Sequence, residues 1–82
     1  MAAQVLNKGP VEITVNNHRV KIHSPATGLE IKQAAVDAGI PIELDFILER
    51  EQGDEAVEIA DDEKIDLHDD DKFTAADGDD NA

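Results

Sequence analysis

The first clear pattern in the chain is an alternation of apolar and polar residues in two neighbouring stretches. The apolar positions are Val11, Ile13 and Val15 in the first stretch, and Val20 and Ile22 in the second. This period of two is typical of strands with one buried face. Asn16 and Asn17 separate the stretches, and asparagine tolerates the left-handed conformations of a tight hairpin turn. The pattern predicts a β-hairpin in which Ile13 pairs with Val20, and Val11 with Ile22.

A helix signal follows the hairpin. Thr27 stands three residues before Glu30, the spacing of a capping box, in which each side chain bonds a free backbone N–H at the helix start. Gly39 and Pro41 mark the end, because glycine favours the left-handed stop and proline bars continuation. One stripe at helical spacing is formed by Ile31, Ala34, Ala35 and Ala38. The sequence predicts a helix of about three turns, and its small residues favour close packing on a sheet.

Three further strands are predicted after the helix. A third strand near 43–51 would place Leu44, Phe46 and Leu48 on one face, a short fourth strand contains Val57 and Ile59, and a last strand turns Phe73 and Ala75 inward. Two hairpin strands, one helix laid across the sheet and three more strands make an α+β, β-grasp arrangement with a mixed sheet. We expect a flexible lead-in over 1–10, a β-grasp domain over 11–76 and a flexible acidic tail over 77–82.

Length and composition limit the possible functions. The chain has 82 residues, enough for one domain, and its lack of cysteine excludes disulfides, thiolate catalysis and thiolate metal sites. No apolar run approaches the roughly 20 residues that span a bilayer, and the first residues do not resemble a secretory signal. We expect a cytoplasmic protein without a cofactor.

The formal net charge of −13 is concentrated in the second half of the chain. Five acidic and four basic residues precede Glu49, whereas fifteen acidic and three basic residues lie from Glu49 onward. The negative electrostatic potential of such a surface repels nucleic acid and membranes with anionic lipids, and it favours partners with basic surfaces. The alternative is a solvated surface that serves only solubility.

Two segments resemble a known family. They are Thr27-Gly28-Leu29-Glu30-Ile31-Lys32 and Ile59-Ala60-Asp61-Asp62-Glu63-Lys64-Ile65-Asp66-Leu67, preceded by Ile13-Thr14-Val15-Asn16 and followed by Phe73. The chain is similar here to the bacterial multiubiquitin-type domain, over roughly 11–76. The resemblance implies a ubiquitin-like modifier with three partners: an ATP-dependent activating enzyme, a relative of the conjugating enzymes and a processing peptidase. The chain departs from the family in holding one copy and in ending without a pair of glycines.

The tail is the first candidate functional feature. An activating enzyme must reach a C-terminal carboxylate through a narrow passage, which requires an extended end with small side chains. Removal of the last four residues would leave Gly78 as the reactive end, and the intact chain would use Ala82. The alternative is an ordinary acidic terminus with no covalent role.

Two apolar patches are further candidates. Ile47 lies between Phe46 and Leu48, so alternation turns it to the face away from the helix, which Thr14 and Thr74 are expected to share. The resemblance implies that such a face docks partners, although a lone surface isoleucine is also common. Leu29 and Val36 lie together on the helix, opposite Ile31, and either pack under a loop or form a second contact surface.

The other polar groups point to no chemistry. Arg19, Lys21 and His23 form a short basic stripe, but nucleic-acid binding would need more charge and stacking aromatics. The three histidines have no zinc-like spacing, and no base accompanies Ser24, the only serine. The surface lysines could accept a modifier; they are Lys8, Lys21, Lys32, Lys64 and Lys72.

These observations predict a bacterial ubiquitin-like protein modifier that is a substrate of other enzymes and not itself an enzyme. The alternative is a non-covalent binding or adaptor module that uses the sheet face and the acidic surface. A third hypothesis, a β-grasp sulfur carrier, would need a glycine carboxylate at the end of the chain.

Overall fold

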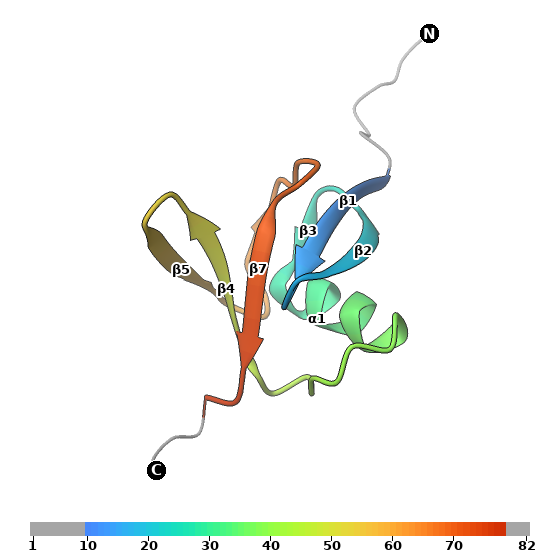
Figure 1. The fold of residues 1–82 in the computed structure, drawn as a ribbon, viewed down its shortest axis with the longest axis vertical. Coiled ribbons are helices and arrows are strands. Elements are labelled where there is room, and N and C mark those ends of the chain that lie inside the picture. The colour runs from blue at the N-terminus through green and yellow to red at the C-terminus, as the bar shows by residue number, and fades with distance from the viewer. Residues whose placement is uncertain (1–9, 79–82) are drawn as a thin grey trace, which may run out of the picture.

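Five strands form the main sheet of the computed structural model, which describes residues 10–78. In the order β2-β1-β7-β4-β5 across the sheet, they are β2 (His18–His23), β1 (Pro10–Val15), β7 (Lys72–Ala76), β4 (Ile47–Gln52) and β5 (Glu55–Ile59). β1 and β7 run parallel and the other neighbours antiparallel. Helix α1 (Gly28–Asp37) packs on one face, and the short strands β3 (Ala26–Thr27) and β6 (Lys64–Ile65) pair separately (Figure 1). The α+β, β-grasp prediction is confirmed.

The first hairpin has the predicted register. Ile13 pairs with Val20 and Val11 with Ile22, so the apolar residues of both strands share one face. Asn16 and Asn17 form the turn with φ angles of 52° and 70°. Two successive left-handed residues characterise the turn whose twist matches that of the flanking strands, which explains why two asparagines suit this position.

The helix begins and ends as the capping signals predict. The Thr27 hydroxyl accepts the Glu30 N–H at 3.1 Å, and the Glu30 carboxylate accepts the Thr27 N–H at 2.8 Å. At the other end Gly39 has a φ of 90°, a backbone conformation that residues with a Cβ rarely adopt. Ile31 and Ala35 are completely buried, whereas Ala38, the last residue of the predicted apolar stripe, is exposed at the C-cap.

Removal of the capping box tests the start of the helix. Thr27→Ala is expected to lower the free energy of unfolding by about 1 kcal/mol, because the Glu30 N–H loses its acceptor. Urea denaturation followed by circular dichroism measures the change. Thr27→Ser keeps the hydroxyl and should retain most of the stability. Equal urea midpoints for the alanine variant and the wild type would contradict the assigned contribution of the cap.

The predicted third strand is wrong over its first four residues. β4 begins only at Ile47, Leu44 is 40% exposed, and the Phe46 N–H bonds the Glu43 carbonyl at 3.0 Å to close a turn. The apparent alternation of Leu44, Phe46 and Leu48 therefore spans a turn and a strand. The chain must first return from the end of the helix to the sheet, and on this path Ile40 and Ile42 fill the core instead.

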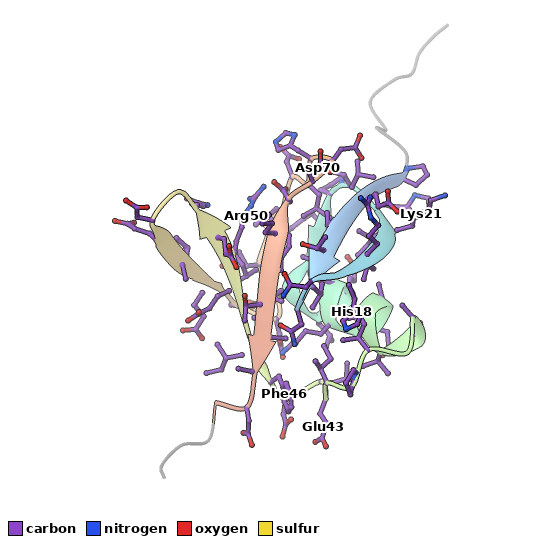
Figure 2. The ribbon with its side chains drawn as sticks, in the orientation of Figure 1. His18, Lys21, Glu43, Phe46, Arg50 and Asp70 are labelled. Atoms are coloured by element: carbon purple, nitrogen blue, oxygen red, sulfur yellow. The ribbon has the colours of Figure 1, made fainter. Side chains whose placement is uncertain are left out.

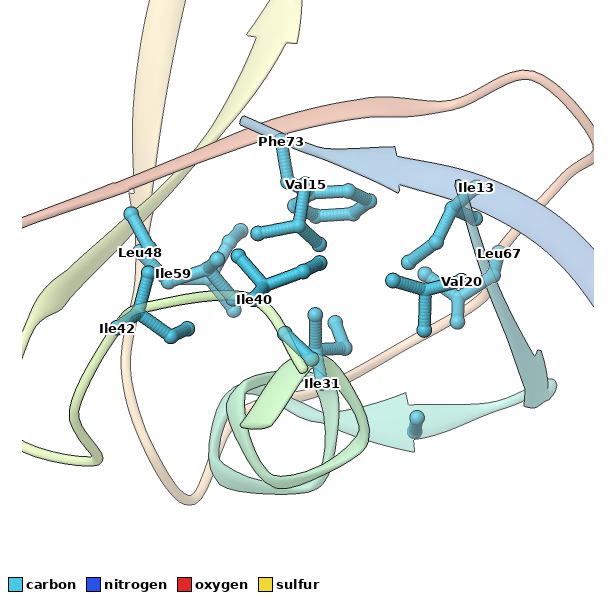
Figure 3. Close-up of a cluster of buried hydrophobic side chains, with 13 residues drawn as sticks. Ile13, Val15, Val20, Ile31, Ile40, Ile42, Leu48, Ile59, Leu67 and Phe73 are labelled. Atoms are coloured by element: carbon cyan, nitrogen blue, oxygen red, sulfur yellow. The ribbon is translucent and has the colours of Figure 1, made fainter. Parts of the chain in front are cut away.

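The core lies between the helix and the sheet. Its largest fully buried side chains are Phe73, Ile13, Ile31, Leu48, Leu67 and Val15 (Figure 3). Phe73 and Ala75 are buried, so the predicted inward face of the last strand is confirmed. Val57 and the buried Ile59 are two residues apart and share one face of β5. Val57 is nevertheless exposed, because β5 is an edge strand.

Arg50 covers one end of this core. Figure 2 labels the Arg50 side chain. Its guanidinium carbon lies 5.7 Å from the centre of the Phe73 ring, and one guanidinium nitrogen donates to the Asp71 carboxylate at 2.6 Å and to the Asp66 carbonyl at 3.1 Å. The guanidinium group thus lies over the ring, and its charge is paired with Asp71 in a partly buried site, where the two side chains are 17% and 19% exposed.

Candidate interaction surfaces

The face of the sheet that the helix leaves open carries Thr14 and Thr74 close together. Each lies between two buried residues of its strand, so its side chain points away from the helix. Both line one hollow of about 270 Å³, which we call the threonine hollow. The Thr74 hydroxyl donates to the Glu51 carboxylate there at 3.2 Å. The other lining residues are Asn16, Asn17, Lys72 and Phe73.

Ile47, the third residue of the predicted patch, lies at a different hollow. It is the first residue of β4, is 36% exposed, and pairs with Ala76, two positions further along β7 than Thr74. The hollow beside it measures about 410 Å³ and is called here the Ile47 hollow. Its lining residues are Lys32, Asp45, Phe46, Ile47, Leu48, Glu58, Ile59, Ala60 and Asp61. The predicted patch is therefore divided between two hollows.

Lys32 is buried and not a surface lysine, so the sequence-based prediction that it could accept a modifier is wrong. It is 3% exposed, and its ammonium donates to the Asp61 carboxylate at 2.7 Å and to the Phe46 carbonyl at 2.6 Å. Those two partners come from segments on either side of the Ile47 hollow. The lysine thus fixes both walls, a role that only the tertiary contacts reveal.

The chain leaves the sheet beside Ile47. β7 ends at Ala76, and a Cβ added to Gly78 would collide with the Ile47 side chain, so the backbone there lies directly on the isoleucine. Upstream, the Asn16 amide accepts the Ala75 N–H and donates to the Ala75 carbonyl, both at 2.9 Å. The asparagine, predicted only as a turn residue, therefore also anchors the end of β7. Ala82, the other predicted reactive end, lies outside the described residues.

The second predicted patch is divided as well. Leu29 is 42% exposed near the start of the helix, and its N–H donates to the Asp61 carbonyl at 3.0 Å. Val36, two turns further on, is half-buried and packs against the core. Of the two residues, Leu29 is the more exposed.

A family model described as Multiubiquitin matches residues 11–73, more than half of the chain. The chain belongs to the multiubiquitin family. Neither a curated protein nor a solved structure matches it. Family membership and the observed β-grasp architecture together identify a small ubiquitin-like protein, and the ubiquitin-like fold is not itself catalytic.

In this multiubiquitin-family domain the only serine has a structural partner. Ser24 is buried, and its hydroxyl accepts the Leu67 N–H at 2.8 Å. Within residues 10–78, no three His, Asp or Glu side chains are grouped so that they could hold a metal ion. The helix found in that part of the chain is neither long nor apolar enough to cross a membrane.

Proposed function

We propose that this protein is a modifier of other proteins, attached through the segment that follows β7. Membership of the multiubiquitin family is the observation that carries the proposal. The geometry supports it, because the Asn16 amide holds Ala75 in the sheet while Asp77 and Gly78 are exposed beyond it. A rigid strand followed directly by an exposed segment with small residues presents a chain end to another enzyme.

The chemistry belongs to the partners, an ATP-dependent activating enzyme and a relative of the conjugating enzymes. The terminal carboxylate attacks the α-phosphate of ATP, pyrophosphate leaves, and an acyl adenylate forms. A nucleophile of the enzyme then attacks the carbonyl carbon and releases AMP. A final transfer to an acceptor group joins the modifier to its target, so the domain itself supplies no catalytic residue.

The length of the segment beyond Ala76 distinguishes the two candidate ends. Two residues beyond Ala76 span at most about 7 Å when extended, whereas six residues span at most about 21 Å. Processing at Gly78 by a peptidase would therefore leave a short end that also touches Ile47. An enzyme that accepts this end must bind close to the start of β4.

Mass spectrometry with an activating enzyme tests the proposal. The full chain, a form ending at Gly78 and a form ending at Ala76 are each incubated with ATP and an activating enzyme of the ubiquitin type. One of the two longer forms should exchange pyrophosphate and gain the mass expected for an adduct on a protein, and the form ending at Ala76 is the control. No exchange and no adduct with either longer form would refute the modifier proposal.

The alternative is a non-covalent binding module, favoured by the two hollows on a strongly acidic domain. This function needs surface contacts but no free chain end. A protein that is captured equally well by the full chain and by the form ending at Ala76 would support it over attachment.

Substitution at Ile47 separates surface function from folding. Ile47→Asp should weaken binding of partner proteins at least about tenfold, because a carboxylate replaces an apolar contact group. The free energy of unfolding should change by less than about 1 kcal/mol, since the side chain is 36% exposed. Pull-down and thermal denaturation measure the two effects. A large loss of stability would show that Ile47 belongs to the core.

A further inference from the structure

The Ile47 hollow combines an apolar wall with carboxylates that have no counter-charge. Phe46, Ile47 and Ile59 supply the apolar wall. Asp45 and Glu58 also line the hollow and are exposed, and neither carboxylate forms a hydrogen bond or ion pair within residues 10–78. The volume of about 410 Å³ is in the range of hollows that accept one or two side chains or a small ligand.

Among residues 10–78, the one cationic side chain that lines the hollow is already paired. The Lys32 ammonium is paired with Asp61 and with the Phe46 carbonyl, so Asp45 and Glu58 keep their negative potential. A ligand that enters this hollow therefore meets apolar side chains and two exposed carboxylates that have no partner within residues 10–78. This arrangement favours a long side chain with an apolar stem and a cationic head.

The neighbouring strands add to the negative potential. Glu49 stands directly opposite Glu58 in the β4–β5 pair, and like charges at such positions destabilise a sheet. On the other side Glu49 faces Thr74, which is uncharged. Within residues 10–78 no Lys, Arg or His side chain forms an ion pair with Glu49 or Glu58, and a cation from another molecule would relieve the repulsion.

The charge of the hollow also decides between possible occupants. In the sequence of the chain's own tail, Asp79 and Asp80 follow Gly78, and both carry the same negative charge as Asp45 and Glu58. Phosphate-bearing partners are repelled for the same reason. A second copy of this chain carries the same excess of negative charge.

We propose that the Ile47 hollow binds a basic segment of a partner protein. The stem of an arginine or lysine lies along Phe46 and Ile47, its cationic head pairs with Asp45 and Glu58, and a neighbouring apolar residue fills the rest of the hollow. This inference rests on the proposed role as a protein that other proteins recognise, and it does not require covalent attachment.

An NMR titration tests the proposal with two synthetic peptides. One is a capped heptapeptide of alternating arginine and leucine, and the other has glutamate in place of each arginine. The basic peptide should shift backbone amide signals mainly within 45–48 and 58–61, while the acidic peptide causes no shifts there. Asp45→Asn combined with Glu58→Gln should raise the dissociation constant of the basic peptide at least about tenfold.

A matched pair of substitutions controls for general attraction to an acidic protein. Asp54→Asn with Glu55→Gln removes the same charge from the exposed β4–β5 turn and the first position of β5, outside the hollow, and should change the dissociation constant less than about twofold. Both double variants should melt at or above the wild-type temperature, because they remove only exposed carboxylates. Equal weakening by the two pairs, or shifts centred on the threonine hollow, would overturn the proposal.

The attachment assay keeps this inference separate from the proposed modifier function. Peptide binding in the hollow without any pyrophosphate exchange would support the docking site and refute covalent attachment. Adduct formation by the full chain without localised peptide shifts would refute the docking site and support the modifier.

Discussion

Replacement of Asp61 by alanine is expected to lower the free energy of unfolding by about 2–3 kcal/mol, more than replacement of Lys32 by methionine. Without Asp61, a buried ammonium keeps only the Phe46 carbonyl as an acceptor, and leaving a buried charge unpaired is strongly destabilising. Without the lysine charge, Asp61 returns to water, because its side chain is 58% exposed. Methionine keeps the apolar stem, so we expect Lys32→Met to cost only about 1 kcal/mol.

A double-mutant cycle measures this asymmetry by urea denaturation. The double variant should be close in stability to Lys32→Met alone, because removal of the carboxylate matters little once the ammonium is gone. Asp62→Ala is the matched control, since Asp62 is an exposed neighbour with no partner in the described part of the chain. Equal stabilities of the Asp61→Ala and Asp62→Ala variants would show that the buried pair contributes nothing.

The elements with local signals were predictable from the sequence. The hairpin register depends on alternation within twelve residues and on two asparagines that tolerate a positive φ. The helix start depends on Thr27 and Glu30, which are three residues apart. Such contacts involve neighbouring residues, so a pattern in the sequence is sufficient to identify them.

The features that sequence reasoning missed depend on residues far apart in the chain. Lys32 has the ordinary pattern of a polar helix residue, and its burial follows from the approach of Phe46 and Asp61. The anchoring bonds of Asn16 reach Ala75, 59 positions away. Division of the predicted patch likewise follows from the β4–β7 register, which alternation within one strand cannot specify.

The two segments that carry the family resemblance lie against each other. Ala26 and Thr27 pair with Ile65 and Lys64, and Lys32 binds Asp61. The Gly28 and Leu29 N–H groups donate to the Glu63 and Asp61 carbonyls, at 3.1 and 3.0 Å. The motif pair therefore describes how the start of the helix is fixed to the β5–β6 connection. It specifies the fold, whereas candidate binding groups such as Ile47 and Glu58 lie beside it.

Gly28→Ala tests this junction, because its expected effect is opposite to the usual one. Alanine normally stabilises a helix relative to glycine by about 1 kcal/mol. At Gly28, however, a Cβ would collide with the Ala60 carbonyl oxygen, a backbone atom that cannot turn aside as a side chain can. Relief of the collision moves the connection away and weakens the bonds from Gly28 and Leu29. We expect the free energy of unfolding to fall by about 2–3 kcal/mol.

Gln33→Ala is the control for alanine in this helix. Gln33 is exposed, and its side-chain amide donates one hydrogen bond to the Asp37 carboxylate at 3.1 Å. Its replacement should therefore change the free energy of unfolding by less than about 0.5 kcal/mol. Urea denaturation of both variants gives the comparison. Hydrogen exchange adds a local measurement, because Gly28→Ala should speed exchange of the Leu29 amide far more than that of Val20 in the sheet. A Gly28→Ala variant as stable as the wild type would mean that the junction accommodates the added Cβ without loss of stability. The contact with Ala60 would then not explain why glycine stands at this position.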